Sequence, residues 1–163
     1  MAKARLDSSA ELITGGSTDK SLGYFVQPTL IQTAGLSNGL MQDELFGPIV
    51  AVHVFPDRAF QEMTVAINEQ SRYGLTGAIF ATERAPLQQA AADLRHTAGN
   101  LYLNDKPTGA VVGQQPFGGA RQSGTNDKAG SALNLLRWIS PRTIKETFAP
   151  PLDYRYPHLG IRS

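Results

Sequence analysis

The sequence of 163 residues contains no cysteine. This absence excludes disulfide bonds, a thiolate metal site and a cysteine nucleophile within the chain. Long apolar runs are also missing, because a run such as Ile49 to Phe55 is far shorter than the roughly 18 to 20 residues that span a membrane. The opening stretch MAKARLDSSAEL has no apolar signal core. We therefore expect a soluble, cytoplasmic protein with no membrane span.

The chain also has no large excess of positive or negative charge. Fifteen Lys and Arg residues stand against fourteen Asp and Glu residues, and the two signs are mixed along the chain. Bulk electrostatics therefore predicts no nucleic-acid partner and no acidic membrane surface. Apolar residues make up 41% of the chain and charged residues 18%, which is typical of one globular domain or part of a larger one. Folded alone, such a chain is expected to bury on the order of two thirds of its surface.

Strand and helix patterns alternate along the middle of the chain. Pro28 favours an edge strand or a broken strand over 24–32, since proline cannot donate to a ladder. The Val-rich run 49–55 predicts a central strand covered on both faces. Helical spacing follows over 58–72 and between Thr82 and Gly99, and strand patterns lie at 75–81 and 100–104. This order predicts an α/β fold, with an open, largely parallel sheet flanked by helices.

The two ends of the chain carry weaker patterns. The first thirteen residues resemble the end of a helix that stops at Gly15. The glycine-rich stretch 105–130 predicts a long functional loop or a linker. A short helix is expected over 133–138, a strand over 142–148 that has no obvious partner in its own chain, and an extended tail over 150–163.

Few residues suggest chemistry by their spacing. The histidines His53, His96 and His158 are too far apart in sequence for a helical metal site, and no glycine motif matches a phosphate loop or a dinucleotide site. Two segments remain. In DELFGPIVAV, Glu44 and Phe46 precede a rigid turn at a strand entry, and in QQPFGGARQSG the bulky Phe117 lies among glycines. The alternatives are a turn with Phe46 in the core, and a flexible connector.

Five motifs, in order and at matching spacing, are GYFVQPTL, ELFGP, YGLTGAIF, AGNLYLN and PFGGARQSG. From about residue 23 onward the chain resembles the aldehyde dehydrogenase superfamily. The stretches NDKPTGAVVGQQPFGGARQSGTNDKAG and LLRWISPRTIKET resemble its 1-pyrroline-5-carboxylate dehydrogenases, which oxidise L-glutamate γ-semialdehyde to L-glutamate with NAD in proline degradation.

The resemblance implies that the chain is the C-terminal part of such an enzyme. Residues 1–139 would belong to the catalytic domain, and residues 140–163 would form an oligomerisation strand and an extended tail. The nucleophilic cysteine, the general base and the dinucleotide-binding domain of the family precede the GYF motif, so the chain alone is expected to be inactive and to hold no catalytic residue. A eukaryotic source would imply the mitochondrial matrix.

The resemblance also assigns binding roles. Glu44 matches the residue that holds the nicotinamide ribose hydroxyls of NAD, and Phe46 matches the residue beside the nicotinamide. Gly109 and Ala110 match the loop that binds the far carboxylate of the substrate, and Phe117 lines its aliphatic part. Familiar members carry serine at the position of Ala110, so one hydrogen bond to a charged group is lost, an effect of roughly 1.5 to 3 kcal/mol.

Three functions stay open at this point. The first is a segment of a glutamate semialdehyde dehydrogenase that forms a homo-oligomer through its C-terminal strand. The second is a non-catalytic relative that binds a ligand or regulates a complete subunit. The third is an assembly module with no site.

Overall fold

A computed structural model describes residues 8–156 and residue 158. Its larger sheet joins strands β1 (Ala10–Thr14), β4 (Thr29–Thr33) and β5 (Ile49–Val52) in the order β1-β4-β5. β1 pairs antiparallel with β4, and β4 pairs parallel with β5. β4 is the most buried of these strands, and Ile31 at its centre is 1% exposed. The centre of this sheet therefore lies on β4.

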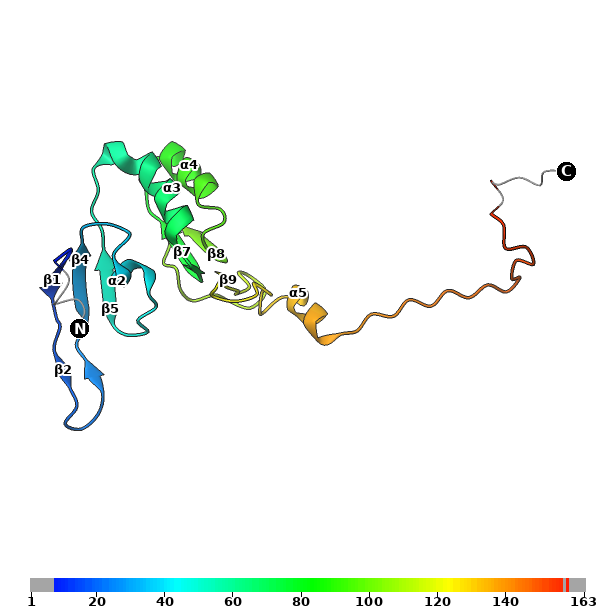
Figure 1. The fold of residues 1–163 in the computed structure, drawn as a ribbon, viewed down its shortest axis with the longest axis horizontal. Coiled ribbons are helices and arrows are strands. Elements are labelled where there is room, and N and C mark those ends of the chain that lie inside the picture. The colour runs from blue at the N-terminus through cyan, green and yellow to red at the C-terminus, as the bar shows by residue number, and fades with distance from the viewer. Residues whose placement is uncertain (1–7, 157, 159–163) are drawn as a thin grey trace.

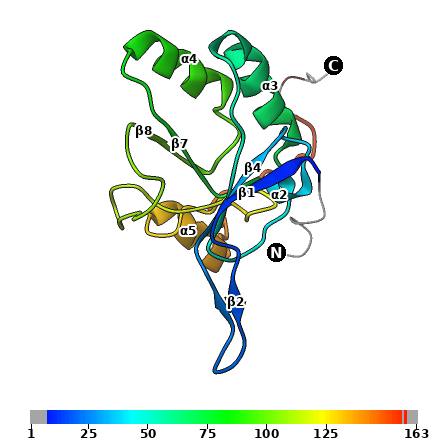
Figure 2. The same ribbon diagram turned by 90° about the vertical axis from the view of Figure 1, so that its left-hand side faces the viewer.

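A second sheet pairs β7 (Thr76–Ile79) with β8 (Asn100–Leu103) in parallel. Helix α3 (Phe60–Gln70), which follows the 3-10 turn Asp57–Ala59, links the two sheets, and α4 (Arg84–Asp93) links β7 to β8. Figures 1 and 2 show α3 and α4 on one side of the β7–β8 pair. α4 buries Leu87 and Ala90, at the i, i+3 spacing of one helix face. The predicted helices and strands of this region are confirmed.

Short elements complete the described chain. β2 (Thr18–Asp19) and β3 (Phe25–Val26) form a hairpin, and β6 (Tyr73–Gly74) pairs with β9 (Ala120–Arg121). The helices α2 (Gly39–Gln42) and α5 (Ala132–Leu135) are single turns, and the 3-10 turn Leu136–Trp138 follows α5. The α/β class is confirmed, with parallel pairs at its centre, although the strands form separate small sheets.

Two expectations about the larger sheet are wrong. Residues 10–14 form the strand β1 instead of a helix end, because hydrogen bonding to β4 overrides a weak helical pattern. The run 49–55 was expected to be central, yet β5 is at the edge and Val50 is 57% exposed. Its second face has no covering element in the part of the chain that the structure describes. The broken strand expected at Pro28 is confirmed, because β3 ends before it and β4 begins after it.

The strand expected over 142–148 does not form within this single chain. Residues 139–147 carry no helix or strand, and Figure 1 shows the segment running away from the body. A strand needs a hydrogen-bonded neighbour, and the described chain places none beside this segment. The expected loop at 105–130 is confirmed, apart from the two residues of β9.

The accessible surface is much larger than that of a compact monomer. It amounts to 12788 Å² for 17.6 kDa, whereas a compact monomer of this mass exposes about 7,900 Å². The chain thus buries only about half of its unfolded surface, and the expected two thirds is wrong. Large apolar side chains remain exposed on the hairpin, the strand ends and the tail, among them Leu22, Tyr24, Phe80, Trp138, Phe148 and Tyr154. Exposure of this extent marks surfaces that another part or another subunit covers.

Candidate functional site

The segment with Glu44 and Phe46 is a turn at the entry to β5. Asn38 caps the start of α2 by accepting a hydrogen bond from the Leu40 amide at 2.8 Å, and at the end of this helical turn the Asp43 amide donates to the Gly39 carbonyl at 2.9 Å. The Pro48 carbonyl then accepts the Thr29 amide at 2.9 Å, which ties the turn to the start of β4. Glu44 is exposed. The turn therefore presents a carboxylate at the amino ends of two parallel strands.

Phe46 has an unusual backbone. Its φ is +51°, and its side chain is 94% exposed. A bulky residue in the left-handed region costs roughly 1 to 2 kcal/mol, and exposing the ring forgoes the gain from burial. The alternative that Phe46 belongs to the core is therefore wrong in this structure. Strained, exposed residues concentrate at ligand-binding sites, and this observation favours a binding role for Phe46.

Phe117 is held by backbone hydrogen bonds on both sides. Its amide donates to the Ala129 carbonyl at 2.9 Å, and its carbonyl accepts the Ala129 amide at 2.7 Å. The side chain of Asn100 donates to the Pro116 carbonyl at 3.1 Å and accepts the Gly118 amide at 3.3 Å. The ring is 38% exposed. The segment is thus fixed in place, and the alternative of a flexible connector is not supported.

Gly109 and Ala110 lie in the same loop as Phe117. Gly109 has φ +81° and accepts a hydrogen bond from the Gln115 side chain at 3.2 Å. A left-handed backbone here suits glycine, which carries no Cβ. Ala110 is half-buried. The loop before Phe117 is therefore held in shape by a hydrogen bond from one of its own side chains.

Arg72 joins the Glu44 turn to the loop of Phe117. Its guanidinium contacts the Asp43 carboxylate at 3.1 Å, and its carbonyl accepts the Gln122 amide at 3.1 Å. Both side chains of the ion pair are about half exposed, so the pair contributes at most about 1 kcal/mol to stability. Instead, the contacts of Arg72 hold the Glu44 turn and the loop of Phe117 in position relative to each other. The two segments that the sequence singles out are connected through one residue.

A second arginine anchors the glycine-rich segment. Arg121 has φ +53°, and its guanidinium donates to the His96 carbonyl at 3.1 Å, to the Ser71 carbonyl and to the Asn68 side chain at 2.8 Å. These bonds fix β9 against the end of α3 and the turn after α4. Charged donors on backbone carbonyls make strong hydrogen bonds, so Arg121 holds the segment that follows Phe117.

The next part of the loop is fixed from the other side. Asp127 accepts hydrogen bonds from the Thr125 hydroxyl and from the Arg137 guanidinium, the latter at 2.7 Å. These two hydrogen bonds hold the pKa of Asp127 below its ordinary value, and the bond from Thr125 has the larger effect. The carboxylate therefore stays ionised and links the loop to the 3-10 turn after α5.

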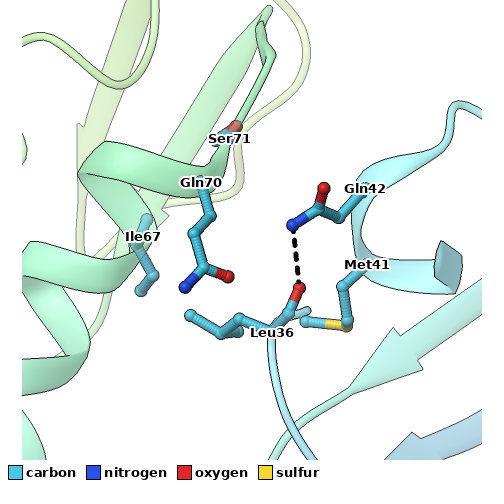
Figure 3. A pocket seen from close by; sticks show the side chains of 6 residues that line it. All are labelled: Leu36, Met41, Gln42, Ile67, Gln70 and Ser71. Carbon is cyan, nitrogen blue, oxygen red and sulfur yellow. Dashed lines mark hydrogen bonds between the residues drawn. The ribbon is translucent and has the colours of Figure 1, made fainter. Parts of the chain in front are cut away.

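Figure 3 shows a small cavity between the two parts of the fold. It measures about 150 Å³ and is lined by Leu36, Met41, Gln42, Ile67, Gln70 and Ser71. Gln42 donates to the Leu36 carbonyl at 3.3 Å across it. Ligand pockets usually hold about 300 to 1,000 Å³, so this cavity is a packing gap beside α2 and α3 rather than a substrate site.

The carboxyl ends of β7 and β8 form a wide hollow, the place where open α/β sheets usually bind ligands. It is lined by Phe80, Ala81, Thr82 and Asn104. The amide of Asn104 is used by the chain itself, because it accepts the Ala81 amide at 2.9 Å and donates to the Ala81 carbonyl at 3.0 Å. Without an ionisable lining residue the hollow offers no acid, base or charge, so the candidate site stays at the Glu44 turn and the loop of Phe117.

Among residues 8–156 and 158, no group of three metal-ligating carboxylate or histidine residues occurs. Over the same residues, no helix combines the length and the apolar character that a membrane crossing requires.

The sequence did not point to Arg72, Asn100, Arg121 or Lys128. Each acts through hydrogen bonds to groups that are distant in the chain, such as Arg121 to Ser71 at a separation of 50 residues. A polar Asn100 at the start of an otherwise apolar strand was the only local signal for one of them.

Gly99→Ala tests the close packing of the loop on β8. A Cβ at Gly99 would lie 1.7 Å from the Gly118 carbonyl oxygen. We expect a loss of about 1 to 3 kcal/mol in the free energy of unfolding, because the backbone must shift to relieve the clash. Thermal unfolding measures it. Gly35→Ala is the matched control, since nothing lies within 4 Å of its Cβ position, and equal melting temperatures for both variants would contradict the packing.

Comparison with known proteins gives a consistent result. The model of the aldehyde dehydrogenase family matches residues 1–144, so the match begins earlier than the resemblance at residue 23 suggested. The mitochondrial delta-1-pyrroline-5-carboxylate dehydrogenase of Bos taurus is 50% identical over 156 residues, which are 96% of this chain and 28% of that protein. The human protein of the same name is 46% identical, again over 96% of this chain and 28% of that protein. The chain thus spans about 28% of the length of these curated relatives.

Solved structures agree with this result. The delta-pyrroline-5-carboxylate dehydrogenase from Mycobacterium tuberculosis, bound with NAD, has a TM-score of 0.79 at 49% identity, over 98% of this chain and 29% of that chain. A betaine aldehyde dehydrogenase from Staphylococcus aureus, in complex with NAD⁺, has a TM-score of 0.77 at 27% identity, over 96% of this chain and 30% of that chain. The family model covers well over half of the chain, and the chain belongs to the aldehyde dehydrogenase family.

Proposed function

We propose that this chain is the C-terminal part of an NAD-dependent dehydrogenase that oxidises L-glutamate γ-semialdehyde to L-glutamate in proline degradation. The observation that carries the proposal is the identity of 46% to 50% with delta-1-pyrroline-5-carboxylate dehydrogenases over 96% of the chain. The more distant betaine aldehyde dehydrogenase shares only 27%. The difference in identity favours the semialdehyde as substrate over other aldehydes.

In this proposal, the Glu44 turn binds the nicotinamide end of NAD. The residues present suit it, because the Glu44 carboxylate is exposed and the Phe46 ring, 94% exposed on a strained backbone, offers an apolar face. Glu44 accepts hydrogen bonds from the ribose hydroxyls, and Phe46 limits the movement of the ring. NAD supplies a hydride acceptor when it is bound.

The loop of Gly109, Ala110 and Phe117 binds the substrate in the same proposal. Backbone amides near Gly109 hold the far carboxylate, since a glycine-containing turn can direct N–H groups at an anion. Phe117 packs along the aliphatic part. With Ala110 at the adjoining position, recognition of the carboxylate depends on the backbone alone. The connection through Arg72 then sets the distance between the two binding segments.

The bond-making groups lie outside this chain in the proposal. The sequence has no cysteine to form a thiohemiacetal with the aldehyde. The chain therefore positions substrate and cofactor, and the remainder of the enzyme supplies the nucleophile, the general base and the dinucleotide-binding domain.

The boundary at residue 139 and the oligomeric assembly belong to the proposal as well. The helical part of the body ends at Trp138, and the segment that follows exposes Ile144 and Phe148 by 79% and 92%. We propose that residues 140–163 form a strand and a tail against a second subunit. Pro157 and residues 159–163 of that tail lie outside the described residues. The cytoplasmic location stays a prediction, whereas the names of the bovine and human relatives place those proteins in mitochondria.

The test is an assay of the complete protein that contains this segment. Formation of NADH from glutamate semialdehyde is compared with that from propanal, a short aldehyde with no carboxylate. The proposal predicts a kcat/KM at least about tenfold higher for the semialdehyde, since a hydrogen-bonded charged group contributes roughly 1.5 to 3 kcal/mol. A complete protein with no turnover of either aldehyde would favour a non-catalytic relative, and equal values would remove the substrate assignment.

Glu44→Gln in the complete enzyme tests the cofactor contact. We expect kcat to fall or the KM for NAD to rise by about tenfold, because an amide replaces the charged acceptor of the ribose hydroxyls. Binding of an adenine nucleotide without nicotinamide should stay unchanged. Glu62→Gln is the control, since Glu62 is an exposed carboxylate on α3. Unchanged kcat and KM for NAD in Glu44→Gln would exclude the contact.

A further inference from the structure

Asn100 is the first residue of β8 and is only 8% exposed. Its side chain has contacts on both sides of Phe117, donating to the Pro116 carbonyl at 3.1 Å and accepting the Gly118 amide at 3.3 Å. Together with the two bonds between Phe117 and Ala129, these contacts fix four consecutive backbone groups around the ring.

Lys128 acts on the same side chain. Its ammonium group donates to the Gly99 carbonyl and, at 3.3 Å, to the Asn100 Oδ1 atom. Both acceptors are neutral oxygens. The backbone of Lys128 is left-handed, with φ +56°, so the residue keeps a costly conformation while it reaches these acceptors.

The lysine, the Gly118 amide and the Pro116 carbonyl together set which way the Asn100 amide points. If the amide turned over, its NH₂ group would face two donors, the Lys128 ammonium and the Gly118 amide, and its oxygen would face the Pro116 carbonyl. Each contact would then join donor to donor or acceptor to acceptor. The positive charge makes this reversed state especially unfavourable in a partly buried site.

The geometry points to Asn100 and Lys128 as positioning residues that set the specificity of the dehydrogenase for its carboxylate-bearing aldehyde by fixing the Phe117 ring. This inference rests on the proposed function, because Phe117 lines the aliphatic part of the substrate only in that proposal. The two residues touch no substrate themselves. They act through the backbone of the loop, whereas the cofactor contact is made by a different segment.

The experiment compares Lys128→Met with the parent in the complete enzyme. The KM for glutamate semialdehyde is expected to rise by about fivefold, the effect of losing roughly one hydrogen bond, with kcat and the KM for NAD within about twofold. Turnover of propanal, which has no carboxylate for the loop to hold, is expected to change less than that of the semialdehyde. Lys128→Arg, which keeps a cationic donor, is expected to recover most of the loss. Lys20→Met is the control, since Lys20 is exposed on the β2–β3 hairpin.

A KM for the semialdehyde equal to that of the parent would overturn the inference. So would an equal rise in the KM for NAD, which would indicate a general structural role. If Lys128→Met does not fold, Asn100→Asp gives the result, because it keeps the acceptor for Lys128 and turns only the Pro116 contact repulsive. This variant should show the same rise in the KM for the semialdehyde, and an unchanged KM would overturn the inference. A parent enzyme without semialdehyde turnover would instead refute the proposed function.

Discussion

The isolated chain of 163 residues is expected to form no NADH from glutamate semialdehyde and NAD. With no cysteine in the sequence, no thiolate can attack the aldehyde, and serine or threonine hydroxyls need an adjacent base to act as nucleophiles. Residues that position ligands cannot replace a group that forms a bond. The loss relative to a complete enzyme is therefore expected to be total.

The measurement is the absorbance of NADH with purified chain, semialdehyde and NAD, beside a buffer blank. A complete family member, such as the dehydrogenase from Mycobacterium tuberculosis, is the positive control for the substrate preparation. A rate above the blank that increases with the concentration of the chain would contradict the proposal that the bond-making groups lie outside this chain.

The second large effect is expected from the C-terminal segment. Deleting residues 140–163 from the complete enzyme should leave it monomeric or aggregated, with reduced activity. Ile144, Phe148, Tyr154 and Tyr156 are each more than two thirds exposed in this chain, and Figure 1 shows their segment away from the body. Apolar and aromatic side chains of this kind are typical of interface cores.

Light scattering with size-exclusion chromatography measures the assembly. The pair Ile144→Asp and Phe148→Asp should have the effect of the deletion, because a buried unpaired charge is costly at an interface. Lys145→Gln, a change at an exposed charge in the same segment, should leave the assembly intact. A deleted enzyme with the oligomeric state and the activity of the parent would exclude this segment from the interface.

Much of the fold follows from local patterns. The helices α3 and α4 and the strands β7 and β8 were predicted, since their apolar spacing and bounding glycines are contained in the segments themselves. The edge position of β5 was not predicted. An Ile- and Val-rich run indicates that a strand will be covered, but it does not indicate which chain covers it. β1 was missed because its pairing with β4 is a contact between distant residues.

The candidate site divides in the same way. The Glu44 turn and the loop of Phe117 were found from unusual residue combinations and from the family resemblance. The residues that hold them were not, since Arg121, Asn100 and Lys128 bind backbone groups that no sequence spacing reveals. The strain at Phe46, with φ +51°, also needed the structure.

The central claim is that this segment positions the semialdehyde and NAD for chemistry carried out by the rest of a dehydrogenase. A chimera tests it directly, with residues 1–163 in place of the matching segment of the Mycobacterium tuberculosis enzyme, whose structure with NAD has a TM-score of 0.79 to this chain. The measurement is kcat/KM for glutamate semialdehyde. The account predicts turnover within about tenfold of the parent, since aligned binding segments preserve the reacting geometry. A chimera that folds and assembles like the parent, yet forms no NADH, would contradict it.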